Sequence, residues 1–138
     1  MTRERWNRIA LWLFFAGGIA WGLKLIAIAA NGGEGSPLEG ILFIIGLATL
    51  LVGSSGIGGT LLLRAARPVY LAGCILSPVA FWFFFTFMDP VGRSVLSPPE
   101  DHWFYDETGI LITAVTAAVV GLLLLRRKGN IEPGKGLP

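Results

Sequence analysis

The stretch Ile9–Ala30 reads IALWLFFAGGIAWGLKLIAIAA and contains a single charged residue, Lys24. An α-helix rises 1.5 Å per residue, so these 22 residues would extend over about 33 Å. The hydrocarbon core of a bilayer is roughly 30 Å thick. Three later stretches have similar length and composition: Leu38–Leu63, Val69–Met88 and Thr108–Leu125. The sequence therefore predicts an all-α integral membrane protein, an antiparallel bundle of four transmembrane helices.

The composition of the whole chain agrees with a membrane location. Of its 138 residues, 54% are hydrophobic and 14% are charged, whereas about 25% of a typical soluble domain is charged. The longest break between apolar stretches, residues 89–107, is too short to fold as a soluble domain. We predict one transmembrane domain over residues 1–128. Residues 129–138 are rich in glycine and proline and are predicted to form a disordered cytoplasmic tail.

The distribution of charge predicts the orientation in the membrane. Arg and Lys concentrate in short cytoplasmic loops. With four crossings, nine of the eleven basic residues fall on one side: Arg3, Arg5, Arg8, Arg64, Arg67, Arg126, Arg127, Lys128 and Lys135. Seven of the nine acidic residues fall on the other side. We therefore predict an up-down-up-down protein of the plasma membrane with both termini cytoplasmic. Because the basic residues lie at helix ends, where they set topology, we predict no nucleic-acid partner.

A cleaved secretory signal is the alternative interpretation of the first stretch. Basic residues precede an apolar run, and Ala27-Ile28-Ala29 resembles an A-x-A cleavage site. The apolar run exceeds 20 residues, however, and Lys24 lies just before the cleavage site. Both features favour a retained membrane helix.

Two segments carry the same signal for a helix start. Ser36-Pro37-Leu38-Glu39 and Ser97-Pro98-Pro99-Glu100 each fit a capping box with proline at the first helical position. In the first segment the apolar stretch follows directly. In the second, polar and aromatic residues intervene before Thr108. We therefore predict a short outer interfacial helix from Pro98, with a bend at Gly109 before the fourth span.

Small residues at four-residue spacing mark faces where membrane helices approach closely. Such pairs occur in the first, third and fourth spans: Gly18 and Gly22, Gly73 and Ser77, Ala114 and Ala118, Ala117 and Gly121. The aromatic run Phe81–Phe87, FWFFFTF, surrounds its helix on all sides. At least one of its faces must therefore meet lipid or a partner protein.

The segment Gly53–Thr60 reads GSSGIGGT and lies within the second span. It lacks the lysine of a phosphate-binding loop, because Gly59 stands before Thr60. Two interpretations remain open, a close helix crossing and a locally unwound helix that lines a polar path. In either case Ser54 and Ser55 are candidate functional residues, because their hydroxyls can satisfy freed backbone groups.

Lys24 is the only basic residue within a span, and ionisable groups inside a membrane are candidates for function. Its side chain can also extend to the interface without any such role. Glu39 begins the next span at a similar height, so a Lys24–Glu39 ion pair is expected. The pair would be either structural or part of a transport path.

His102 is the sole histidine, and on a helix it would share one face with Asp106. A divalent cation could bind such a pair, but one histidine among acids is a poor metal signature. A solvated acidic surface is the favoured interpretation, so we predict no metal and no cofactor. Cys74 is the only cysteine and lies within a span. No histidine is available near it to form a nucleophilic site, so we predict no enzymatic activity.

No motif in the sequence indicates a reaction or a ligand. We predict an accessory or interaction subunit of a membrane complex, whose partner is another membrane protein or a second copy of the chain. The alternative is a small oligomeric transporter or channel that uses Lys24, Glu39 and the segment 53–60.

Overall fold

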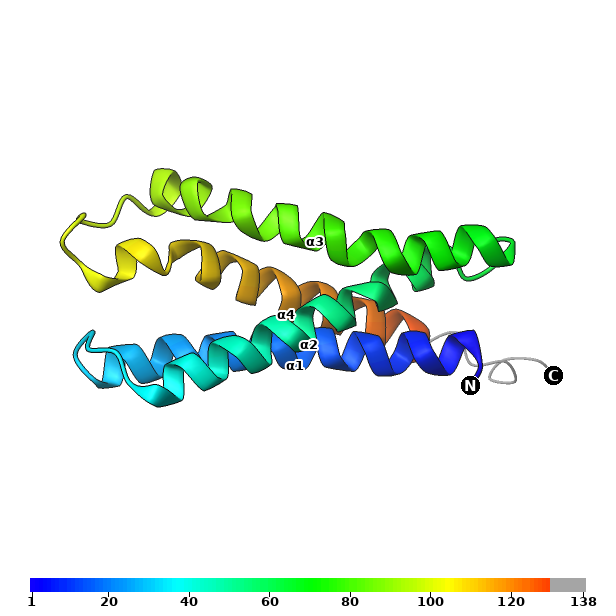
Figure 1. The fold of residues 1–138 in the computed structure, drawn as a ribbon, viewed down its shortest axis with the longest axis horizontal. Helices are drawn as coiled ribbons and strands as arrows, with labels where there is room; N and C mark the ends of the chain where they lie inside the picture. Colours follow the sequence, from blue (N-terminus) through cyan, green and yellow to red (C-terminus); the bar gives the residue numbers. More distant parts are fainter. Residues whose placement is uncertain (130–138) are drawn as a thin grey trace.

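The computed structural model describes residues 1–129, which form four long α-helices and one short 3₁₀ helix (Figure 1). The elements are α1 (Arg3–Ala30), α2 (Pro37–Leu61), α3 (Arg67–Leu96), η1 (Trp103–Asp106) and α4 (Thr108–Gly129). All four α-helices are long and apolar enough to cross a membrane. The prediction of an all-helical chain with four candidate spans is confirmed. Of the predicted tail, residues 130–138 lie outside the described part, and Gly129 is the last residue of α4.

Different chain segments form the two ends of the helical bundle (Figure 1). The N-terminal end is formed by the start of α1 and the α2–α3 turn, residues 62–66. The loop end is formed by the α1–α2 turn, residues 31–36, and the α3–α4 connection, residues 97–107. Helix α1 packs against α2 and α4, and α3 packs against the same two helices. Residues from all four helices form the core: Phe14, Trp21, Leu25, Leu50, Phe81, Ile110, Ala114 and Ala117.

Glycines allow α2 to cross α1 at very short range. A Cβ atom at Gly53 would lie 2.6 Å from the Cα of Phe14, and one at Gly56 would lie 3.0 Å from the backbone nitrogen of Leu11. Helix α2 continues without interruption through this segment to Leu61. Of the two interpretations of residues 53–60, the close helix crossing is therefore confirmed and the locally unwound helix is wrong.

The predicted small-residue faces are also contact faces on the other helices. A Cβ atom at Gly18 would lie 2.9 Å from the carbonyl oxygen of Ala114 on α4, and Gly73 on α3 faces Gly58 on α2. Gly22 does not take part, because a Cβ atom there would meet nothing within 4 Å. Close backbone approach at small residues is the packing mode expected of helices that associate in lipid.

Helix α3 is longer than predicted and ends at Leu96, with Ser97 as its C-cap. It continues past Met88 and Pro90 to Leu96, and Ser97 adopts the left-handed conformation with φ 46°. The N–H of Ser97 donates to the carbonyl oxygen of Arg93 at 3.0 Å. The capping box predicted at residues 97–100 is therefore wrong. A residue that precedes proline disfavours the helical region, so Pro98 terminates the preceding helix instead of starting the next one.

The predicted short helix before the fourth span is present as η1, but it begins at Trp103 and is a 3₁₀ helix, so the start at Pro98 and the bend at Gly109 are wrong. Gly109 lies in the first turn of α4, where its missing side chain admits the backbone of Asp89, whose Cα would be 2.7 Å from a Cβ atom. At the first predicted start, Ser36 is the N-cap of α2 as expected. Its hydroxyl donates to the Glu39 carboxylate at 3.2 Å and accepts no hydrogen bond from a backbone N–H of the helix.

Helix α3 packs through one narrow seam and leaves a broad apolar face uncovered. Only 6% of its most apolar stretch is buried, against 33% to 39% for the other three helices. Phe81 points into the core, whereas the other side of α3 exposes Ile75, Leu76, Val79, Trp82, Phe83 and Phe87. We refer to these six exposed residues as the apolar α3 face.

Candidate functional site

A buried ion pair joins α1 to the start of α4 at the loop end. The Lys24 Nζ atom lies 2.6 Å from the Glu107 Oε2 atom, and the two side chains are 9% and 17% exposed. The Phe43 ring on α2 lies beneath the ammonium group, with its centroid 5.6 Å from Nζ. The positive charge is thus matched by a carboxylate and an aromatic face inside the protein.

The expected Lys24–Glu39 pair is wrong, because Lys24 bonds to Glu107 instead. Helices α1 and α4 run in opposite directions and approach closely at Gly18 and Ala114. Six residues beyond Gly18 and seven residues before Ala114 are both about two helical turns from this contact. Lys24 and Glu107 therefore reach the same height on facing sides of the two helices.

Glu39 is buried but makes a different contact. It is only 7% exposed, and the single side-chain hydrogen bond that its carboxylate accepts within the described residues comes from Ser36. It lies on α2 one helical turn before Phe43, which contacts Lys24. The loop end thus contains two inward-facing carboxylates, of which Glu107 holds the lysine.

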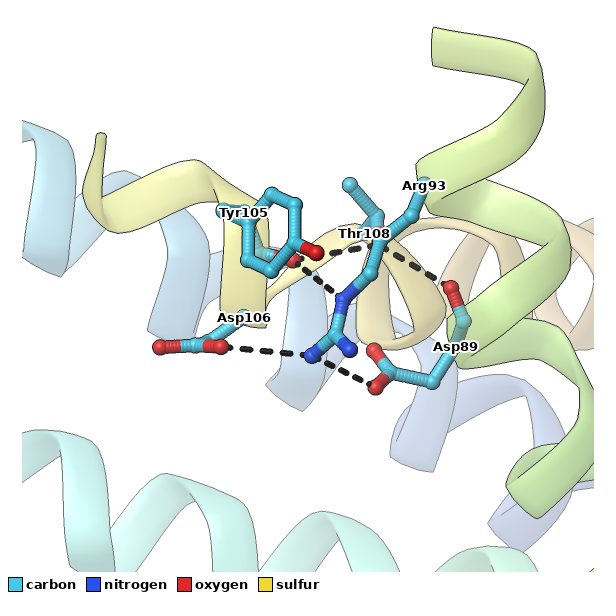
Figure 2. Close-up of polar contacts among 5 residues, drawn as sticks. All are labelled: Asp89, Arg93, Tyr105, Asp106 and Thr108. Carbon is cyan, nitrogen blue, oxygen red and sulfur yellow. Dashed lines mark hydrogen bonds and ion pairs between the residues drawn. The ribbon is translucent and has the colours of Figure 1, made fainter. Parts of the chain in front are cut away.

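A second ionic cluster, centred on Arg93, closes the α3–α4 connection (Figure 2). Its Nη2 atom lies 2.9 Å from Asp89 Oδ2 and 3.2 Å from Asp106 Oδ1, and its Nε donates to the carbonyl oxygen of Tyr105 at 3.1 Å. The guanidinium also stacks on the Tyr105 ring, 4.4 Å from its centroid. The Thr108 hydroxyl donates to the carbonyl oxygen of Asp89 at 3.4 Å. One arginine therefore ties the end of α3 to η1.

The structure does not bring His102 and Asp106 together as a metal-binding pair. His102 caps η1, because its Nδ1 atom accepts a hydrogen bond from the N–H of Phe104 at 3.2 Å. Asp106 pairs with Arg93. The expected shared face requires an α-helix through residues 102–106, and this segment is the short 3₁₀ helix instead. Within residues 1–129 no three His, Cys, Asp or Glu side chains converge on one point.

The two candidate serines of α2 are buried inside the bundle, and Ser54 borders a cavity of about 270 Å³ that Phe81 of α3 and Thr113 of α4 also line. Their hydroxyls donate to carbonyl oxygens of the same helix at 2.7 Å, Ser54 to Leu51 and Ser55 to Val52. These back-bonds satisfy the hydroxyls without water or a ligand. The hydroxyl protons of both serines are therefore used within α2 itself.

Sequence reasoning missed a buried polar contact at the N-terminal end. The Tyr70 hydroxyl on α3 donates to the Asn7 Oδ1 atom on α1 at 2.9 Å, and Asn7 is completely buried. Asn7 precedes the buried Leu11 and Phe14 by four and seven residues, which places all three on one helix face. The spacing of four and seven residues to these apolar positions could have predicted that Asn7 faces the interior.

We expect replacement of Arg93 by glutamine to loosen the α3–α4 connection. The substitution removes the ion pairs with Asp89 and Asp106, which are partly exposed and together stabilise the segment by about 1 kcal/mol. Limited chymotrypsin digestion in detergent should cut faster at Trp103–Tyr105 in this variant. Arg5→Gln is the matched control, since Arg5 is exposed and forms no ion pair with any described residue. Equal cleavage of both variants would contradict the prediction.

The candidate residues therefore form separate clusters with mainly structural contacts. Lys24 and Glu107 neutralise each other, Asp106 holds Arg93, and the two serines face their own helix. No family model, no curated protein and no solved structure matches this chain.

Proposed function

We propose that this chain is a multi-pass protein of the plasma membrane, with four helices crossing in up-down-up-down order and both termini cytoplasmic. We further propose that it acts as an accessory or interaction subunit of a membrane complex, without catalysis of its own. The charge distribution supports this orientation. Seven of the nine acidic residues lie in the sequence at or near the loop end, and Arg3, Arg5, Arg64 and Arg67 lie at the opposite end.

The apolar α3 face is the observation that carries the proposal of an interaction subunit. Its aromatic members Trp82, Phe83 and Phe87 are 45%, 59% and 62% exposed. Aromatic side chains dominate the energetics of protein interfaces, since each covers a large area at a small cost in side-chain entropy. We propose that a transmembrane helix of a different membrane protein packs on this face.

The alternative function, a small oligomeric transporter or channel, needs a hydrated path along Lys24, Glu39 and the segment 53–60. The contacts of these residues favour the accessory role. Lys24 is paired with Glu107, the glycines of the segment 53–60 pack against α1 and α3, and the hydroxyls of Ser54 and Ser55 bond within their own helix. A transport path would leave such groups facing water.

Purification in mild detergent tests the proposed role. We expect a stoichiometric membrane-protein partner to accompany the wild-type chain, and the double variant Phe83→Ala/Phe87→Ala to retain it at least about tenfold less well. Ile44→Ala is the matched control, because Ile44 on α2 is 67% exposed and lies on a different helix.

Three results would contradict the proposal. Retention of the partner by the double variant would exclude the apolar α3 face as its docking surface. Equal loss in the Ile44→Ala control would indicate nonspecific detergent effects. A purified complex that contains only copies of this chain would favour the oligomeric transporter.

A further inference from the structure

A pocket opens at the N-terminal end between the first turns of α1 and α3. Its volume is about 420 Å³, which lies within the range of roughly 300–1,000 Å³ that is typical of ligand sites. Arg3 and Trp6 line it from α1, and Arg67, Tyr70, Leu71 and Cys74 line it from α3. The pocket is separate from both ionic clusters at the loop end.

The charged groups of this pocket are all basic. Two arginines from different helices line it, and no acidic side chain does. Arg67 is exposed and forms no ion pair or side-chain hydrogen bond with any residue in the described range 1–129. The N-cap of α3, Ala66, offers no side-chain acceptor to the first N–H groups of the helix. The partial positive charge of that helix end adds to the two guanidinium groups.

Arg3 is held in place at the edge of the pocket. Its Nη1 atom donates to the carbonyl oxygen of Ala65 at 3.0 Å and to that of Leu63 at 3.4 Å. Its guanidinium carbon lies 4.6 Å from the centroid of the Tyr70 ring. These contacts use one of the three guanidinium nitrogens, so the other N–H groups remain available to an anion. An arginine fixed in this way binds an oxyanion at a smaller entropic cost.

Apolar groups continue the pocket along α3. Leu71 and Cys74 lie one and two helical turns beyond Arg67, and the Trp6 side chain forms part of the opposite wall. A ligand that fills the pocket therefore needs an anionic group beside the arginines and an apolar group beside Leu71 and Cys74. An anionic glycerophospholipid has this arrangement of charge and apolar chain.

We propose that this pocket binds the phosphate of an anionic glycerophospholipid. Arg3 and Arg67 contact the phosphate oxygens, and the first part of an acyl chain lies against Leu71 and Cys74. Arginine suits this contact because its planar fork donates two parallel hydrogen bonds to a phosphate. The inference rests on the proposed membrane topology, which places the pocket at the cytoplasmic interface, where anionic lipids are concentrated.

Native mass spectrometry of the full chain, titrated with phosphatidylglycerol in mild detergent, tests this inference. We expect Arg67→Gln to weaken binding of the tightest lipid about tenfold, because the variant loses a charged hydrogen bond. Arg64→Gln is the matched control. Arg64 is exposed in the α2–α3 turn, three residues before Arg67, and carries the same charge, but it does not line the pocket. This control should bind the lipid within about twofold of the wild type.

Two further arms identify the source of the phosphate. Inorganic phosphate at an equal concentration should not displace the lipid, and complete displacement would indicate a site for a soluble anion and overturn the proposal. Equal weakening of lipid binding by Arg64→Gln would mean that the lipid responds to general surface charge and not to this pocket. That result would also overturn the proposal. The titration needs neither a protein partner nor a membrane orientation. Failure of the proposed function would therefore appear separately, in the co-purification experiment and in a reporter fused to the C-terminal tail.

Discussion

Replacement of Gly53 by alanine is expected to destabilise the chain by about 3 kcal/mol or more, because one added methyl group would force α1 away from α2. The new Cβ atom would lie 2.6 Å from the Cα of Phe14 and 2.8 Å from the carbonyl oxygen of Ala10. Overpacking costs about 1–3 kcal/mol when neighbouring side chains can move. The neighbours of Gly53 are backbone atoms, which cannot move without displacing the whole helix. Unfolding followed by circular dichroism in detergent measures the loss.

Gly22→Ala is the matched control for this prediction. It adds the same methyl group to a helix, but a Cβ atom at Gly22 meets nothing within 4 Å. We expect its free energy of unfolding to be unchanged or raised by up to about 1 kcal/mol, since alanine restricts the unfolded chain. Equal destabilisation by both substitutions would mean that the crossing of α1 and α2 is not set by glycine.

Replacement of Lys24 by methionine is expected to destabilise the chain by about 3 kcal/mol. Methionine keeps most of the side-chain volume but leaves the Glu107 carboxylate, which is 17% exposed, without its counter-charge. Removal of one partner of a buried ion pair typically costs about 3–5 kcal/mol, because the remaining charge stays desolvated. Because Glu107 is partly exposed, we expect a loss at the lower limit of this range. Unfolding by titrated sodium dodecyl sulfate in mixed micelles measures the change.

A double-mutant cycle identifies the partner of Lys24. The variant Lys24→Met/Glu107→Gln carries no unpaired charge, so we expect it to be more stable than Lys24→Met alone. Lys24→Met/Glu39→Gln is the control, and here we expect the two effects to add, because Glu39 bonds to Ser36. If Glu39 shows the coupling and Glu107 does not, the observed pairing is wrong.

Several features of the fold could be predicted from local sequence alone. Composition and length gave the four candidate spans, and small-residue spacing gave Gly18 and Gly73 as contact positions. These predictions need only the hydropathy and shape of single helices. The close crossing at Gly53 was also predicted from the small residues of its own helix, although the sequence left a locally unwound helix as an alternative.

The ion pairs depend on which helices are neighbours, and local patterns do not contain this information. Glu39 and Glu107 both lie near the loop end, so sequence position alone gives no reason to prefer Glu107 as the partner of Lys24. The preference arises because α4 approaches α1 at Gly18. The helix start predicted at Ser97–Glu100 was wrong for a similar reason, because a serine before proline fits the end of one helix as well as the start of another.

The close fit of α1 and α2 has a consequence for biosynthesis. These helices are synthesised before α3 and α4, and Gly46, Gly53 and Gly56 of α2 allow close contact with α1. The hairpin can therefore lock together while translation of the later helices continues. We expect α3 to join this hairpin along its narrow contact, and α4 to complete the bundle through the contact of its alanines with Gly18. The contacts thus permit the helices to assemble in the order of their synthesis.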